Sequence, residues 1–301
     1  MTSSTRAKVP TLAIIALVVV TIVWGAAFVV MKPAIAQEPF FDFLAFRFTV
    51  ATVVMIVVRP LALRAITPKM LLSGVVLALL LGFSYITQTI ALEQTTAAIT
   101  GFLTGLYVVV TPLLAWIVLR QRIRARVWIG SILALIGLGL ISITGGSIEW
   151  PQLWGVACAI LFAGHIVALG KWSPGFDSYA LTIVQLGVIA VMMWIGAAPD
   201  GIQPPPTPEV WFAVAFTALL ATAFAFFMQT WAQARMEASR VAVILTLEVV
   251  FTALIAVLVG QEVLTLKTLL GGALIVLAMF IVEWPSKRAS GAPVIVDPMV
   301  H

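Results

Sequence analysis

Three ionisable side chains lie deep inside long apolar stretches of the sequence: Arg47, His165 and Glu248. An ionised side chain in hydrocarbon costs about 2.5–3.5 kcal/mol on insertion scales, so each of them needs a partner or a water-filled cavity. Arg47 and Glu248 have two interpretations. They bind the carboxylate and the amine of an amino acid, or they form a buried ion pair that locks two helices. Their predicted depths differ by about 8 Å, which two long side chains can bridge.

Neutral polar side chains recur at helical spacing in two neighbouring stretches. The first group is Tyr85, Gln88 and Thr89, and the second is Thr100, Thr104, Tyr107 and Thr111. Both groups could line a cavity. Alternatively, the threonines bond their own backbone and Gln88 only bridges two helices, an interaction of about 0.6–2 kcal/mol.

Trp24, His165 and Gln185 complete the candidate site. Trp24 lies one helical turn before Phe28, so the two rings could stack on an apolar substrate side chain or simply pack between helices. His165 could carry a proton, because histidine titrates near neutral pH, or it could be a packed hydrogen-bonding residue. Gln185 corresponds to Arg47 in an internal repeat described below, so we expect it to face the same cavity.

The composition indicates that membrane-spanning helices position these side chains. Hydrophobic residues make up 62% of the 301 residues and charged residues 10%, against about 45–50% and about 25% in soluble domains. A water-soluble globule and a disordered chain are excluded. The single cysteine, Cys158, argues against a disulfide scaffold and a thiolate metal site. We expect no metal and no cofactor. The net charge of +5 does not indicate nucleic-acid binding, because the basic residues gather in short loops.

Ten apolar segments have roughly the 20 residues that a helix needs to span a bilayer core of about 30 Å. They cover residues 11–32, 40–58, 70–91, 96–119, 126–144, 151–171, 178–198, 209–232, 240–260 and 266–284. Of the 17 Lys and Arg residues, Lys32 and Lys267 fall in outer loops and Arg47 in a span, which leaves 14 on the inner side. This asymmetry predicts that both termini are cytoplasmic. The first span is too long for a signal-peptide core of about 7–15 residues. Pro112 is expected to kink the fourth span.

The sequence also repeats itself. A shift of 141 residues aligns the third to fifth spans with the eighth to tenth and places Gln88 on Gln229, while a shift of 138 places Arg47 on Gln185. Because five is odd, the second repeat must enter the membrane from the opposite side. Inverted repeats of this kind are typical of secondary transporters. We therefore expect an all-α membrane protein of two inverted five-helix repeats around a central cavity. Its parts are a cytoplasmic tail (1–10), the first repeat (11–145), the second repeat (150–285) and a cytoplasmic C-terminal tail (286–301).

Several motifs point to a known family. They are Trp24-Gly25-Ala26-Ala27-Phe28, Phe43-Leu44-Ala45-Phe46-Arg47, Leu247-Glu248-Val249-Val250-Phe251 and Gly260-Gln261-Glu262-Val263-Leu264-Thr265. With these motifs, the sequence resembles the EamA-type transporters of the drug/metabolite transporter superfamily over roughly residues 11–285. The family usually has Glu-Pro at Glu248-Val249 and an acid at Gln121. The resemblance implies a basket of ten helices with a central cavity, in proteins that export amino acids, metabolites or drugs. Within the family, the length and layout are most like those of aromatic amino-acid exporters.

We therefore expect a multi-pass protein of the cell inner membrane that exports amino acids, aromatic or other neutral ones, by alternating access. Its partners would be the small-molecule substrate and the lipid bilayer, without nucleic acid, and it would be a monomer or a homodimer. The alternatives are a drug or metabolite exporter of the same fold and an uncoupled channel. An intramembrane enzyme is disfavoured, because two histidines and one cysteine do not form a catalytic constellation.

Overall fold

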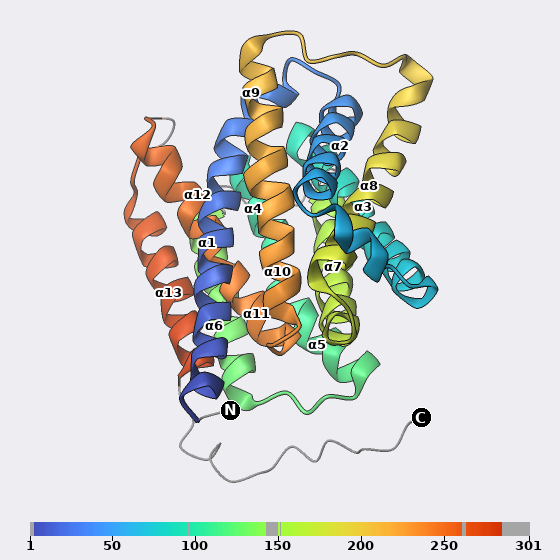
Figure 1. Cartoon of the computed structure of the whole chain (residues 1–301). Helices are drawn as coiled ribbons and strands as arrows, with labels where there is room; N and C mark the ends of the chain where they lie inside the picture. Colours follow the sequence, from blue (N-terminus) through green and yellow to red (C-terminus); the bar gives the residue numbers. More distant parts are fainter. Residues whose placement is uncertain (1–2, 95–96, 143–149, 151, 261–262, 285–301) are drawn as a thin grey trace.

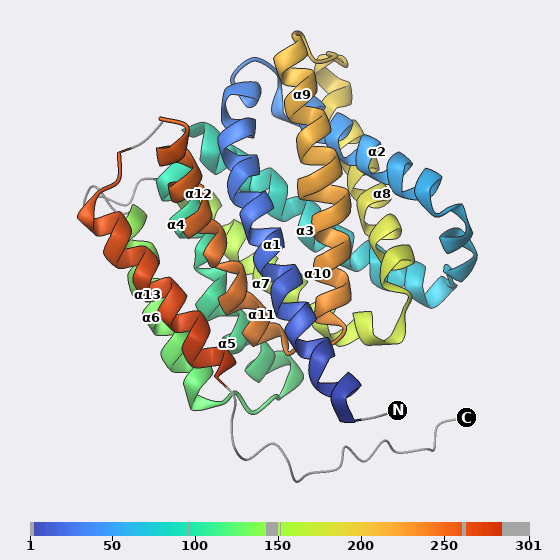
Figure 2. The same cartoon turned by 60° about the vertical axis from the view of Figure 1, so that its left-hand side comes forward.

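The computed structural model describes residues 3–94, 97–142, 150, 152–260 and 263–284, and within these residues the chain is helical and has no strands. The helices form one bundle (Figures 1 and 2). The first half contains α1 (Ser3–Ile35), α2 (Phe40–Val58), the short η1 (Pro60–Ala65), α3 (Pro68–Gln94), α4 (Ala97–Gly105), α5 (Tyr107–Leu119) and α6 (Ala125–Ser142). The second half contains α7 (Gln152–Trp172), η2 (Ser173–Gly175), α8 (Ser178–Ala197), η3 (Ala198–Asp200), α9 (Pro208–Phe216), η4 (Thr217–Phe224), α10 (Ala225–Gln233), α11 (Ala238–Leu245), α12 (Leu247–Leu258) and α13 (Leu266–Glu283).

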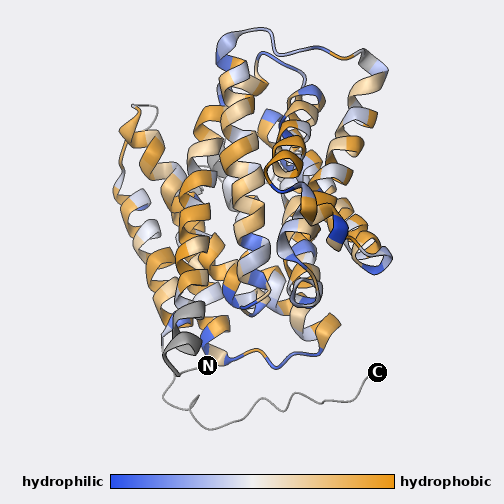
Figure 3. Ribbon diagram, in the orientation of Figure 1, coloured by the Kyte–Doolittle hydropathy of each residue, from blue (hydrophilic) through white to orange (hydrophobic). Residues whose placement is uncertain are grey.

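Each predicted span coincides with one helix, or with consecutive helices, to within a few residues, except that α1 begins at Ser3, eight residues before the first predicted span. Eight of these segments are long and apolar enough to cross a membrane, and two shorter apolar helices cover Leu103–Leu119 and Ala125–Leu140. Most of the bundle is hydrophobic along its length (Figure 3). The predicted repeat boundary at 144–149, the motif residues Gln261 and Glu262, and the tail over 286–301 lie outside the described residues.

Large apolar side chains cover the outside of the bundle. Val57, Leu72 and Leu258, from three different helices, are 72%, 69% and 74% exposed. In water such a surface would be an aggregation hazard, whereas in hydrocarbon it costs nothing. The chain is therefore a multi-pass membrane protein whose outer surface suits lipid.

The two halves run in opposite directions. α1 begins at the lower end of the bundle in Figure 1, and α7, the first helix of the second half, ends there, where η2 joins it to α8. The packing follows the same symmetry. α3 packs against α7 as α10 packs against α1, and α5 packs against α7 as α12 packs against α1. α2 packs against its counterpart α8, and α6 against α13. These pairings are those of two repeats related by a pseudo-twofold axis between them.

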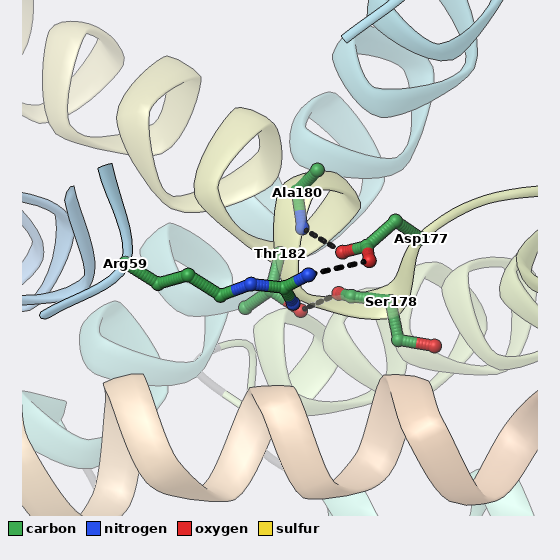
Figure 4. A network of polar contacts seen from close by, with 5 residues as sticks. All are labelled: Arg59, Asp177, Ser178, Ala180 and Thr182. Carbon is green, nitrogen blue, oxygen red and sulfur yellow. Dashed lines mark hydrogen bonds and ion pairs between the residues drawn. The ribbon is translucent and has the colours of Figure 1, made fainter. Parts of the chain in front are cut away.

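Asp177 caps the start of α8 and pairs with Arg59 at the end of α2 (Figure 4). The Asp177 carboxylate accepts a hydrogen bond from the backbone N–H of Ala180 at 2.9 Å and pairs with Arg59 at 3.3 Å. Because the Arg59 and Asp177 side chains are 52% and 33% exposed, the pair adds little stability. The cap has the larger role, because it satisfies an amide at the helix N-terminus.

The fourth and ninth predicted spans are interrupted at corresponding places. α4 gives way to α5 at Leu106, and α11 gives way to α12 at Thr246. Pro112, predicted to kink the fourth span, lies inside α5 six residues after this interruption. Each interruption lies within two residues of a predicted site residue, Tyr107 in one half and Glu248 in the other. Interrupted helices at matching positions of inverted repeats mark the binding region in many transporters.

Gly25 allows α1 to approach α12 closely. A Cβ atom on Gly25 would lie 2.7 Å from the backbone nitrogen of Thr252, whereas one on Gly101 would have no neighbour within 4 Å. Alanine is favoured over glycine in a helix by about 1 kcal/mol. We therefore expect Gly25→Ala to lower the thermal unfolding midpoint in detergent by several degrees, since overpacking costs about 1–3 kcal/mol, while Gly101→Ala should not lower it. Equal midpoints for the two variants would contradict a tight α1–α12 contact.

Glu38 is buried in the connection between α1 and α2. Its side chain is 4% exposed, and neither carboxylate oxygen has a hydrogen-bond partner among the described residues. Burial, with a smaller contribution from the charge of Asp42, raises the pKa of Glu38 from 4.5 to about 7. A raised acid pKa means that the folded state favours the protonated form. The associated stability is complete below the unfolded pKa of 4.5 and is lost as pH rises through about 7.

The unfolding midpoint in detergent should therefore fall between about pH 5 and about pH 8, and Glu38→Gln should flatten this dependence. Thermal unfolding followed by tryptophan fluorescence measures both slopes. Glu209→Gln is the control, because Glu209 is exposed. A slope unchanged by Glu38→Gln but reduced by the control would disprove the assignment to Glu38.

Candidate functional site

A cavity lies between the two halves of the bundle. Residues from both halves line it: Trp24, Ala27, Phe28, Met31, Arg47, Tyr85, Gln88, Thr104, Tyr107, Phe162, Ile166, Gln229, Leu245 and Glu248. Its volume is about 40 Å³, enough for about three water molecules at about 10–15 Å³ each. The buried apolar side chains of the described residues form two clusters, one that includes Phe48 and Leu77 and one that includes Leu17 and Ile244. Trp24 and Phe162 each pack against both clusters, so the cavity lies where the two clusters meet.

Arg47, on α2, supplies the positive charge of the cavity. The residue is 3% exposed. Its Nε donates to the Thr222 hydroxyl at 2.7 Å, and its Nη2 donates to the Tyr85 hydroxyl at 3.3 Å. Its guanidinium carbon also lies 5.1 Å from the centre of the Tyr85 ring, within cation–π range. Arg47 is thus held by neutral acceptors and rings, and no ion pair between described residues joins its charge to a carboxylate.

Glu248, on α12, is the acidic side chain of the cavity. It lines the cavity and is partly exposed there. The ion pairs in the described part of the chain join Arg59 to Asp177 and Arg240 to Glu283, so Arg47 and Glu248 do not form a contact pair. The cavity therefore holds one basic and one acidic side chain that do not contact each other.

The π-helical turn η4 holds two of the lining residues. The indole Nε1 of Trp24 donates to the carbonyl oxygen of Ala221 at 2.8 Å, and Arg47 bonds to the next residue, Thr222. A π-helix pairs residues five apart and is often found at functional sites. Here one irregular turn, in the eighth predicted span, holds both the Trp24 ring and the Arg47 guanidinium at the cavity. No pattern in the sequence predicted this π-helical turn.

Four of the seven predicted polar residues of the third and fourth spans line the cavity, whereas Thr89, Thr100 and Thr111 are not among its lining residues. Tyr85, Gln88 and Tyr107 all line it. The Gln88 amide donates a long hydrogen bond of 3.5 Å to the Thr104 hydroxyl. The Tyr107 ring lies 6.5 Å from that of Phe162 across the boundary between the halves. These groups present hydroxyls, an amide and ring faces to any bound molecule.

His165 and Gln185 do not line the cavity. Both are buried, and the Nε2 of His165 lies 2.9 Å from the Gln185 Oε1, so the two side chains hydrogen-bond across α7 and α8. The Gln185 amide also donates to the carbonyl of Leu181 at 3.3 Å. The structure thus brings six of the eight predicted site residues together. It leaves His165 and Gln185 outside the cavity, hydrogen-bonded to each other between α7 and α8.

The chain matches the EamA-like transporter family twice, at residues 11–143 and at residues 149–284. The chain belongs to this family. Both repeats of the fold are thus EamA-like domains, and the chain is a membrane transporter. EamA-like proteins are transporters and not enzymes, and the family implies a small-molecule substrate.

One relative agrees with the family assignment, and one solved structure shares the fold. An uncharacterized transporter of Archaeoglobus fulgidus is 30% identical over 267 residues, which cover 89% of this chain and 84% of the relative. A crystal structure of a protein shares the fold with a TM-score of 0.78, over 91% of this chain and 96% of the other. Its sequence identity is 17%, so this likeness concerns the fold alone.

The EamA-like repeat explains two lining residues that were not among the predicted site residues. Gln229 is the counterpart of Gln88 at a shift of 141, and Phe162 is the counterpart of Trp24 at a shift of 138. Applying the repeat to every candidate would have found both. Thr222 and Met31, which contact Arg47, had no such signal, because their role depends on which way Arg47 turns.

Proposed function

We propose that this EamA-like transporter exports amino acids, aromatic or other neutral ones, across the cell inner membrane by alternating access. One observation carries the proposal: the cavity between the repeats holds one cation and one anion that do not contact each other. A zwitterion is the solute class that satisfies both charges at once. A simple cation would leave Arg47 unpaired, and a simple anion would leave Glu248 unpaired, both at a cost in a buried site.

The walls of the cavity support an apolar substrate side chain. Trp24, Phe28, Tyr107 and Phe162 present rings from both repeats. Aromatic rings stack face to edge or offset, with about 0.5–1.5 kcal/mol per pair beyond burial. We propose that Arg47 and Tyr85 contact the substrate carboxylate, Glu248 its amine, and Trp24, Gln88 and Tyr107 the rest. His165 and Gln185 are omitted, because they bond to each other outside the cavity.

The small volume of the cavity supports a mechanism with a conformational change. About 40 Å³ is far below the roughly 300 Å³ of an ordinary ligand pocket. A substrate therefore enters only when the repeats move apart on one side. Rocking one inverted repeat against the other opens the two sides in turn.

The proposed topology has ten spans and cytoplasmic termini. α1 begins and α13 ends at the same end of the bundle, as an even number of crossings requires. The 14 inner and two outer basic residues support a cytoplasmic assignment for that end. The proposed repeats extend over 11–145 and 150–285, between tails at 1–10 and 286–301. The length and ten-span layout also resemble those of the aromatic amino-acid exporter YddG.

Counterflow in proteoliposomes tests the function. Vesicles are preloaded with phenylalanine, tryptophan, leucine, aspartate or a cationic drug, and uptake of the labelled compound is followed. We expect saturable exchange of the neutral amino acids and little exchange of aspartate. Exchange of the cationic drug alone would replace the proposal with a drug exporter, and flux without saturation would indicate a channel. Arg59→Gln serves as a control, because its ion pair lies outside the cavity.

A further inference from the structure

A second cavity lies at the end of the bundle where α1 begins and α13 ends. It is formed by the loop between α5 and α6 and by the corner between α10 and α11, and its volume is about 280 Å³. Arg122 and Arg124 line it from the loop, and Glu237 and Ser239 line it from the corner. The cavity shares no lining residue with the central one.

The first turn of α11 opens toward this cavity without a cap. The first backbone amides of a helix have no partner within the helix. Glu237, at the N-cap position, makes no side-chain hydrogen bond to them. The amides and the helix dipole together favour an anion at such an end.

The hydroxyl of Ser239 gives independent evidence for a ligand. Ser239 lines the cavity, is 2% exposed, and its Oγ has no hydrogen-bond partner among the described residues. A buried hydroxyl is costly unless something accepts or donates a hydrogen bond to it, so most such groups in proteins are satisfied. An anion oxygen in the cavity would accept a hydrogen bond from the Ser239 hydroxyl.

The charges around the cavity favour a phosphate group. Arg122 and Arg124 contribute two positive charges against one negative charge from Glu237. Guanidinium groups bind phosphate through paired, charge-assisted hydrogen bonds. We propose that this cavity binds a phosphate group, carried by an anionic lipid headgroup or by a soluble phosphate ester. The bound group joins the α5–α6 loop of the first repeat to α11 of the second and so stabilises their contact.

Thermal unfolding of the purified full-length chain in a neutral detergent tests this site without any transport assay. The 10 tryptophans supply the fluorescence signal. One series adds inorganic phosphate against chloride at equal ionic strength. The other adds dioctanoyl phosphatidate against dioctanoyl glycerol. Stabilisation by a bound ligand raises the midpoint with concentration and yields an apparent Kd.

We expect at least one of the two probes to raise the unfolding midpoint more than its own control. The control for phosphatidate is dioctanoyl glycerol, and the control for inorganic phosphate is chloride. A shift with both probes identifies the phosphate group as sufficient. A shift with phosphatidate alone identifies the lipid as the source, and one with inorganic phosphate alone identifies a soluble phosphate. No shift beyond the controls with either probe would overturn the proposal.

Matched variants distinguish binding in this cavity from a general effect of the protein's charge. Arg122→Gln with Arg124→Gln should raise the Kd at least about tenfold, the loss expected for hydrogen bonds to a charged group. Arg64→Gln with Lys69→Gln removes the same charge from exposed positions outside the cavity and should leave the Kd unchanged. Ser239→Ala should weaken binding without a change of charge, and Glu237→Gln should tighten it. Equal losses in the two double variants would overturn the proposal.

Discussion

Replacing Arg47 with glutamine is expected to reduce counterflow of phenylalanine at least about a hundredfold. A substrate carboxylate would lose charge-assisted hydrogen bonds of about 1.5–3 kcal/mol each, and Glu248 would be left as an uncompensated anion in the cavity. Arg47→Lys should recover only part of the activity, because an ammonium cannot keep the bonds from Nε to Thr222 and from Nη2 to Tyr85.

Substrate analogues make the Arg47 prediction specific. The wild-type protein should prefer phenylalanine to phenylalanine amide, which lacks the carboxylate, and Arg47→Gln should lose this preference. The matched control is Arg59→Gln, which removes an arginine outside the cavity. Unfolding midpoints of both variants must be compared with the wild type, so that a folding defect is recognised. A retained preference for the acid in Arg47→Gln would reject a carboxylate contact.

Replacing Glu248 with glutamine should reduce counterflow of phenylalanine to a similar extent. The affected analogue should now be the one that lacks the amine, not the one that lacks the carboxylate. Here the wild-type preference for phenylalanine over 3-phenylpropionate, which lacks the amine, should disappear, because an ammonium loses its anionic partner. Counterflow with both analogues measures this. Glu209→Gln is the control, since Glu209 is exposed at the start of α9.

The double variant separates substrate binding from a locking ion pair. If Arg47 and Glu248 each bind substrate, Arg47→Gln with Glu248→Gln should be no more active than either single variant. If the two charges instead lock the helices in another conformation, removing both should restore activity relative to either one, because no unpaired charge remains. Such a positive coupling would contradict the proposed roles.

Much of the fold was predictable because the bilayer restricts it. A spanning segment must be a helix of about 20 apolar residues, so the hydropathy pattern located α2 at 40–58, the bounds that the structure gives. The repeat offsets predicted which helices correspond. The interruptions at Leu106 and Thr246 were not predicted, since neither residue is a helix breaker and the one proline nearby, Pro112, lies inside α5.

The candidate site was predictable only in part, for a different reason. A spacing places a residue on a helix face, but a neighbouring helix decides which way a long side chain turns. Arg47 and Gln185 correspond in the repeat, yet Arg47 reaches Thr222 at the cavity and Gln185 reaches His165 away from it. The repeat is thus more reliable for backbone positions than for the ends of polar side chains.

The attachment of Trp24 and Arg47 to neighbouring residues of η4 has a consequence for the release of substrate. A π-helical stretch contains an extra residue, so shifting it by one position rotates the following helix by about 100° and advances it by about 1.5 Å. Ala221 and Thr222 would move together, and with them Trp24 and Arg47, which under the proposed function contact the substrate side chain and its carboxylate. On the proposed function, one shift of η4 would displace the ring contact and the carboxylate contact in the same step, so that substrate release would couple to a single local rearrangement.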